Sequence, residues 1–195
     1  LSYIGAAYGV DSRHFEALSR EHTPLLGNTL YSWNGTAFEY FMPDIFLSPP
    51  KGSLLAASSK HAALWQKIKK CKSLFGISES AYFAFDPDLK LQYKAFGLSE
   101  VALRSSLDKC VITPYASALM LEKSPRAVLK NLSKIETRGA FGKYGFYEAI
   151  DYESNEHIVK SFMAHHQGMI LAAIANAFAS GVIRKAFEKD IKISG

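Results

Sequence analysis

Apolar residues recur at helical spacing along most of this chain of 195 residues. The clearest case runs from Ser53 to Lys72, where apolar side chains repeat about every 3.6 residues and lysines occupy the opposite side. This segment predicts an amphipathic helix of more than about five turns. Its inward face is expected to consist of Leu54, Ala57, His61, Leu64, Trp65, Ile68 and Cys71.

Two further helices are predicted by the residues with which they begin. Pro114 and Pro125 each follow a threonine or serine that can cap a helix, and the missing N–H of proline costs nothing in a first turn. We expect helices over about 114–122 and 125–137, the second ended by Gly139 in the left-handed conformation. The short link between them predicts an antiparallel helical hairpin.

The segment from His157 to Gly181 is apolar on nearly every side, which predicts a helix buried in most directions. His165, His166 and Gln167 interrupt this pattern and are expected to face something polar. Metal binding is not expected there, because no acidic residue or cysteine stands at a metal-site spacing and adjacent helix positions point about 100° apart.

Strand patterns are sparse between these helices. Tyr82–Phe85 and Leu89–Tyr93 flank an Asp-Pro-Asp turn and predict a small β-hairpin. The rest of the segments 73–112 and 138–157 reads as loops longer than ordinary connections, which are expected to carry function. The sequence therefore predicts an all-α fold of helical hairpins with long loops.

The two remaining helical segments lie near the start of the chain. Gly35 to Leu47 reads as a helix that Pro43 ends or kinks. Leu1 to Tyr8 reads as the end of a small-residue helix without an N-cap, and no initiator Met precedes it. We therefore expect residues 1–195 to be one part of a domain in a longer protein.

Composition narrows the class of protein. Hydrophobic residues make up 48% of the chain and charged residues 21%, which is typical of a globular domain with a sizeable core. No apolar run reaches the ~18 residues that a membrane span needs. The net charge of +5 is divided almost evenly between the two halves of the chain, unlike the clustered charge of nucleic-acid binders. No nucleic-acid partner is expected.

Cys71 and Cys110 are the two cysteines of the chain, and they are 39 positions apart. They form neither a metal motif nor a disulfide framework. We expect reduced, packed thiols, with a single bridge left open. No cofactor and no metal is expected.

Candidate chemistry lies in three glutamates, each within a short run of glycines and aromatic residues: Glu39, Glu79 and Glu148. Aromatic neighbours desolvate a carboxylate and raise its pKa. Sites that cleave sugars combine aromatic faces, which stack on pyranose rings, with carboxyl groups tuned for proton transfer or nucleophilic attack. A carbohydrate-active site is therefore the leading hypothesis.

The three glutamates differ in how strongly they favour this role. Glu79 is the strongest candidate, because Ser78 and Ser80 beside it can donate hydrogen bonds to its carboxylate. A capping or arginine-paired glutamate is the alternative. Glu148 lies in a loop that either joins a core or lines a cleft. Glu39 lies in the first turns of a helix, where an acid also suits the helix dipole, so a structural role is equally favoured.

Six motifs follow one another in an order that resembles a known family, the glycoamylase-like domain of cyclic β-1,2-glucan synthases and endo-β-1,2-glucanases. The resemblance extends from about residue 1 to about residue 190. The motifs are Ser32–Pro43, Gly76–Tyr82, Gln92–Gly97, Thr113–Ser117, Tyr144–Tyr152 and Met163–Met169.

This resemblance implies an (α/α)₆ toroid, of which the chain contains roughly the C-terminal half. It implies β-1,2-glucan as the substrate, either hydrolysed or transglycosylated with retention. Glu79 matches the nucleophile of the retaining enzymes. Their proton-donating glutamate lies upstream of the segment that matches Leu1–Ile4, so the upstream half of the domain is the expected partner and this chain alone is expected to be inactive.

Nine further residues are expected to position sugar rings. Lys94 is the least specific of them, because a snorkelling lysine has the same pattern. They are Glu39, Tyr82, Lys94, Tyr144, Tyr147, Glu148, His165, His166 and Gln167.

The main rival is a non-catalytic carbohydrate-binding or interaction module that kept the aromatic loops and lost the pair of acids. The sequence leaves the choice between hydrolase and transglycosylase open. It also leaves open whether the parent protein is anchored to a membrane, cytoplasmic or exported.

Overall fold

The computed structural model describes residues 5, 8–24, 27–104 and 109–189. Helices dominate the described residues, and short strands connect them. The helices are α2 (Arg13–Glu16), α3 (Ala37–Phe41), α4 (Pro43–Phe46), α5 (Leu54–Ile68), α6 (Pro114–Leu119), α7 (Pro125–Thr137), α8 (Ala164–Phe178) and α9 (Val182–Glu188), with a 3₁₀ turn at Ser99–Val101. The strands are β1 (His22–Thr23), β2 (Thr29–Leu30), β3 (Ser80–Phe85), β4 (Leu91–Lys94), β5 (Val111–Ile112), β6 (Phe141–Gly142), β7 (Gly145–Phe146), β8 (Ala149–Asp151) and β9 (His157–Val159).

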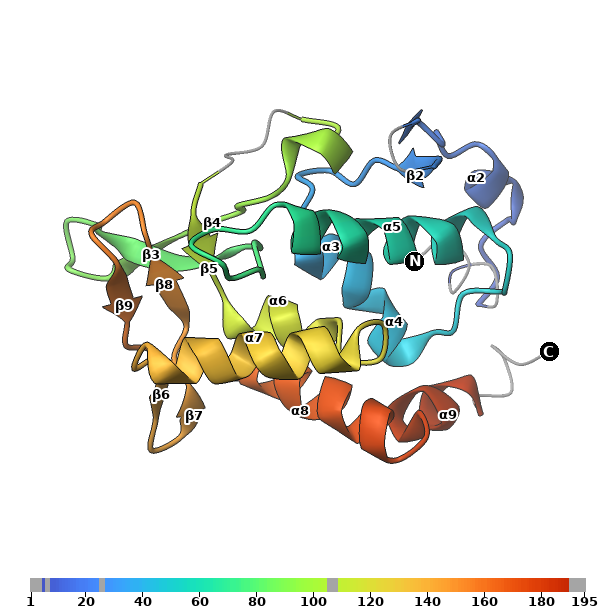
Figure 1. Cartoon of the computed structure of the whole chain (residues 1–195). Helices are drawn as coiled ribbons and strands as arrows, with labels where there is room; N and C mark the ends of the chain where they lie inside the picture. Colours follow the sequence, from blue (N-terminus) through green and yellow to red (C-terminus); the bar gives the residue numbers. More distant parts are fainter. Residues whose placement is uncertain (1–4, 6–7, 25–26, 105–108, 190–195) are drawn as a thin grey trace.

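Helix α6 lies at the centre of the helical layer. Each of its residues is buried, and it contacts α3, α7 and α8. Phe41, Tyr115, Met120 and Val128 fill the core between these helices. In Figure 1, α4 and α9 lie together at one end of the molecule, and their direct contact closes that end of the core.

Strands β3 to β9 gather at the other end of the molecule, whereas β1 and β2 pair with each other near α2 (Figure 1). Strands β3 and β4 form an antiparallel hairpin, while β5, β8 and β9 form a three-stranded antiparallel sheet against which β3 packs. Ile112 pairs with Ile150, and Ile150 pairs with Ile158. A second core cluster, which includes Leu74 and Phe96, lies beneath these strands.

Several local predictions are confirmed. Helices α6 and α7 begin at the two prolines, α4 begins at Pro43 after a break from α3, and β3 and β4 form the expected hairpin. Gly139 has a φ of +82° beyond the end of α7. The expected side-chain caps are absent from α6 and α7: the Thr113 hydroxyl donates to the carbonyl of Glu148, and the Ser124 hydroxyl accepts from Lys67. The expected helix over Leu1–Tyr8 lies for the most part outside the described residues.

The prediction of an all-α fold with one small hairpin misses several strands between the helices. Besides the predicted hairpin of β3 and β4, the segments read as loops, 73–112 and 138–157, contain β5 to β8 and the start of β9. Strands of two or three residues are too short to display the alternation from which strands are recognised. Strand β8 is buried at all three positions, so it has no solvent-exposed face.

The predicted inward face of α5 is partly wrong, although Trp65 and Cys71 of that face pack against the second core cluster. Leu64 and Ile68 are exposed by 39% and 52%, whereas the buried positions are mainly small or polar. The helix packs against α3 and β2, where small side chains allow close approach. Gln66 is buried because its side-chain amide pairs with both backbone groups of Ile77, at 2.8 and 2.9 Å. The buried residues are Ser58, Ser59, Ala62, Ala63 and Gln66.

Helix α8 differs from its prediction in extent and in burial. It begins at Ala164 rather than His157, because His157–Val159 pairs with β8 as strand β9. Its apolar residues are not buried on most sides: Leu171 and Phe178 are exposed by 68% and 77%. This helix therefore presents an apolar outer face in the described structure.

Cys71 and Cys110 form a disulfide, which corrects the expectation of reduced thiols. Their Cα atoms are 5.7 Å apart, within the range that a bridge requires. The tertiary structure brings them together, because Ile77 forms a β-bridge with Ile112 and so joins the two segments that carry the cysteines. Two isolated cysteines gave no local signal of this pairing.

Replacing Cys71 with serine is expected to lower the free energy of unfolding by about 4 kcal/mol, because the bridge closes a loop of 39 residues. Denaturant unfolding of the oxidised wild type and of the variant measures this difference. Adding a reductant should reduce wild-type stability to that of the variant and leave the variant unchanged. Equal stabilities of the oxidised wild type and the variant would contradict the bridge.

Candidate functional site

Glu79 lies directly before β3, where the chain passes close to α6. Gly76 makes this approach feasible: its φ is +121°, and a Cβ there would lie 2.6 Å from the Ser117 hydroxyl and 2.8 Å from the Thr113 carbonyl. Ser78 does not donate to the Glu79 carboxylate as expected, because its hydroxyl lies between the Phe38 N–H and the Tyr115 hydroxyl.

The carboxylate of Glu79 is half-buried and accepts a hydrogen bond from the Tyr93 hydroxyl at 3.2 Å. Burial raises the pKa of Glu79 above that of an ordinary glutamate, and the neighbouring Glu39 raises it further. The Tyr93 hydrogen bond and nearby His166 lower it. Glu79 therefore combines the partial desolvation and the hydrogen-bond donor that a tuned carboxyl group needs.

Tyr93 connects Glu79 to a buried pair of residues. Its hydroxyl also lies 3.3 Å from Nε2 of His166. Nδ1 of His166 lies 2.9 Å from a carboxylate oxygen of Glu148, which in turn accepts from the Ala81 N–H at 3.1 Å. His166 is 1% exposed and Glu148 2%, so these two predicted sugar-positioning residues face each other inside the protein.

Tyr115 supports the same group of residues from α6. Its ring stacks on that of His166 at 3.7 Å, and its hydroxyl donates to the backbone carbonyl of Glu79 at 2.9 Å. Burial raises the pKa of Tyr115 well above its ordinary value. Sequence reasoning did not select Tyr93 or Tyr115 as site residues, although both lie within the quoted motifs.

Tyr144, Tyr147 and Phe162 form an aromatic group on the other side of the N-terminus of α8. Tyr144 is 69% exposed, and its ring meets that of Phe162 edge-on at 5.8 Å. The rings of Tyr147 and Phe162 are 5.1 Å apart. Exposed rings held in this way can stack on sugars. Phe162 was not selected from the sequence.

Two other predicted residues lie in the first turn of α8. Gln167 donates from its side-chain amide to the Phe146 carbonyl at 3.0 Å and so ties α8 to β7. His165 is exposed, and its ring lies 4.1 Å from that of His166. Partial burial and the neighbouring His166 lower the pKa of His165.

The remaining predicted residues have local partners. Glu39 completes a capping box at α3, and its carboxylate accepts from the Ser32 hydroxyl and from the N–H groups of Asn34 and Thr36. In the hairpin, the Lys94 ammonium lies 5.2 Å above the ring of Tyr82. Tyr82 is partly exposed and Lys94 is exposed, so both side chains of the hairpin remain accessible to solvent.

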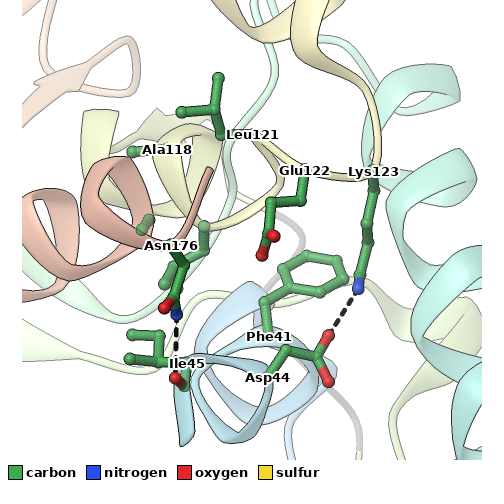
Figure 2. A pocket seen from close by; sticks show the side chains of 10 residues that line it. Phe41, Asp44, Ile45, Ala118, Leu121, Glu122, Lys123 and Asn176 are labelled. Atoms are coloured by element: carbon green, nitrogen blue, oxygen red, sulfur yellow. Dashed lines mark hydrogen bonds and ion pairs between the residues drawn. The ribbon is translucent and has the colours of Figure 1, made fainter. Parts of the chain in front are cut away.

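Two cavities lie elsewhere in the described structure, and Glu79 lines neither of them. The smaller is shown in Figure 2 between α4, α8 and the turn after α6, where Asn176 donates to the Ile45 carbonyl and Lys123 pairs with Asp44. Its volume of about 20 Å³ suits a water molecule rather than a sugar. The larger, of about 690 Å³, is mainly apolar and includes Leu30 and Leu47 in its wall.

Within the described ranges, no cluster of three or more His, Cys, Asp or Glu residues could hold a metal ion. In the same part of the chain, no single helix has the length and apolar character to cross a membrane. Taken together, α8 and α9 have that length and apolar composition, with a bend of 93° between them.

The described structure thus places a half-buried glutamate beside a short β-hairpin, with tyrosines and histidines around it, in a helix-rich domain of the glycoamylase family. The chain belongs to this family, described as putative glucoamylase, which matches residues 7–190. Among curated proteins, it is 33% identical over 191 residues to the cyclic β-(1,2)-glucan synthase NdvB of Rhizobium meliloti (strain 1021). The match covers 92% of this chain and 7% of that protein.

Solved structures share the fold. An endo-β-1,2-glucanase from Chitinophaga pinensis, in complex with sophorotriose and glucose, has a TM-score of 0.74 at 18% identity, over 99% of this chain and 51% of that one. A putative glucoamylase from Bacteroides fragilis NCTC 9343 has a TM-score of 0.65 at 22% identity, over 84% of this chain and 39% of that one. The chain thus spans about half or less of these relatives.

Proposed function

We propose that this chain is the C-terminal half of a domain that acts on β-1,2-glucan, by hydrolysis or by retaining transglycosylation, with Glu79 as its nucleophile. The observation that carries the proposal is the half-buried Glu79 carboxylate, held by the Tyr93 hydroxyl and raised in pKa by burial. The names of the synthase and glucanase relatives support β-1,2-glucan as the substrate class.

Retaining chemistry requires a second carboxyl group about 5–5.5 Å from the nucleophile. The two other candidate glutamates of the described residues are engaged elsewhere: Glu148 is paired with His166, and Glu39 caps α3. We therefore assign the proton donor to the upstream half of an (α/α)₆ toroid. The exposed apolar residues of α8, including Leu171 and Phe178, suit a surface covered by that half.

Sugar rings would stack on the exposed aromatic group of Tyr144, Tyr147 and Phe162, with His165 and Lys94 as hydroxyl partners. The exposure of Tyr144 and the edge-on support from Phe162 favour this role. Such contacts would hold the chain of glucose units while Glu79 attacks the anomeric carbon.

The complete domain, with its upstream half present, is expected to bind β-1,2-glucan oligosaccharides and convert them to shorter or rearranged products. Calorimetry with a ladder of these oligosaccharides, combined with chromatographic product analysis, measures both properties. Laminari-oligosaccharides of matched length, linked β-1,3, are the control substrate and should remain intact. Binding without any product would instead favour a non-catalytic carbohydrate-binding module.

A further inference from the structure

Tyr93 lies between two hydrogen-bonding groups and has one proton to donate. Its hydroxyl oxygen is 3.2 Å from a Glu79 carboxylate oxygen and 3.3 Å from His166 Nε2. A carboxylate can only accept, whereas Nε2 either accepts or donates according to whether it carries a proton. The state of His166 therefore decides whether the Tyr93 proton is available to Glu79.

Glu148 sets the orientation of the imidazole ring. Its buried carboxylate can only accept a hydrogen bond, so Nδ1 of His166 is the donor of that contact and Nε2 faces Tyr93. When both ring nitrogens carry protons, Nε2–H donates to the Tyr93 oxygen and Tyr93 donates to Glu79. The four side chains Glu148, His166, Tyr93 and Glu79 form a hydrogen-bonded series, and each then has a donor or an acceptor opposite it.

The surrounding structure keeps this series in place. The ring of Tyr115 stacks on His166 at 3.7 Å, and Glu148 also accepts from the Ala81 N–H in the strand that follows Glu79. His166 and Glu148 are almost completely buried, so solvent does not compete for their hydrogen bonds. The series joins α8, β4 and the segment before β8 to a single carboxylate.

We propose that Tyr93, oriented by His166 and Glu148, is a positioning residue that holds the Glu79 carboxylate pointed toward the sugar. The inference rests on the proposed function of Glu79 and adds a residue that the motifs did not single out. Tyr93 does not react itself: it donates one hydrogen bond, which leaves one oxygen of Glu79 free for the anomeric carbon.

In the complete domain, Tyr93→Phe is expected to lower kcat on β-1,2-glucan by about 10- to 100-fold, the usual effect of losing a hydrogen bond to a charged group, while KM changes less than about threefold. Tyr152→Phe, which removes a hydroxyl outside this series, should leave kcat unchanged. An unchanged kcat for Tyr93→Phe, or a change confined to KM, overturns the positioning role.

Two substitutions of His166 distinguish a residue that orients Tyr93 from one that only forms the hydrogen bond with Glu148. A glutamine amide extends to the place of Nε2 and can still contact Tyr93, whereas an asparagine amide reaches the place of Nδ1 and serves Glu148 alone. The proposal expects His166→Gln to keep the higher kcat when both variants are compared at equal folded fractions. The opposite order means that the histidine acts only by supporting Glu148, and it overturns the proposal.

A measurement without turnover tests the contacts themselves. In the ¹⁵N NMR spectrum of the 195-residue chain, Tyr93→Phe should shift the Nε2 resonance of His166, and Tyr152→Phe should not. An unshifted Nε2 overturns the series of contacts, whatever the enzyme does. A shifted Nε2 in a complete domain that leaves β-1,2-glucan intact overturns the proposed function, and with it the catalytic role of Tyr93.

Discussion

Replacing Glu79 with glutamine in the complete domain is expected to abolish turnover of β-1,2-glucan, a loss of at least about 10³-fold in kcat. The amide is nearly the same size as the carboxylate but cannot form a covalent glycosyl intermediate. Binding of the oligosaccharide should weaken by less than about tenfold, because the aromatic contacts remain. Product analysis and calorimetry on the same preparation measure the two effects.

The matched control for Glu79→Gln is Glu156→Gln, which alters an exposed glutamate in a weak ion pair with Arg138. This control should retain wild-type kcat. Burial raises the pKa of Glu79, so the nucleophile ionises at a higher pH than an ordinary glutamate does. The acidic limb of the wild-type pH profile of kcat should therefore have an apparent pKa above the ordinary glutamate value. Turnover by Glu79→Gln at the wild-type rate would exclude Glu79 from the mechanism.

Replacing Glu148 with alanine is expected to cost about 3–5 kcal/mol of unfolding free energy, since each buried donor left without an acceptor costs about 1–3 kcal/mol and the N–H at Nδ1 of His166 is one of them. The change also removes the acceptor for the Ala81 N–H and opens a void beside β3. Chemical denaturation monitored by circular dichroism gives the difference, and a loss of this size can unfold a marginally stable domain.

Glu156→Ala is the comparison for this experiment, because an exposed ion pair contributes at most about 1 kcal/mol. Glu148→Gln keeps the shape of the side chain and one acceptor oxygen. Its free energy of unfolding should lie between those of Glu148→Ala and Glu156→Ala. If Glu148→Ala proves as stable as Glu156→Ala, the buried pair with His166 does not contribute as the structure indicates.

The local elements were predictable because their signals lie within a few residues. Pro114 and Pro125 mark helix starts, and Pro43 marks a break in a helical segment, through backbone geometry that does not depend on the rest of the fold. The Asp-Pro-Asp turn likewise determines the hairpin of β3 and β4. The ordered motifs also predicted the family, which the match over residues 7–190 confirms.

The inward face of α5 could not be predicted in the same way. Its apolar period suggested one stripe, but the neighbours of the helix select another, where small side chains fit and Gln66 pairs with Ile77. Burial depends on what packs against a helix, and hydrophobic periodicity describes only the helix itself.

The sequence alone determined where α6 and α7 begin, where the chain turns between β3 and β4 and which glutamates stand among aromatic residues, because these features depend on neighbours along the chain. Only the tertiary structure decided that Glu148 faces His166 inside the protein and that Tyr93 reaches Glu79. It also decided that Cys71 meets Cys110. Hydrogen bonds and disulfides act over a few ångströms, so their partners are chosen by how distant segments pack.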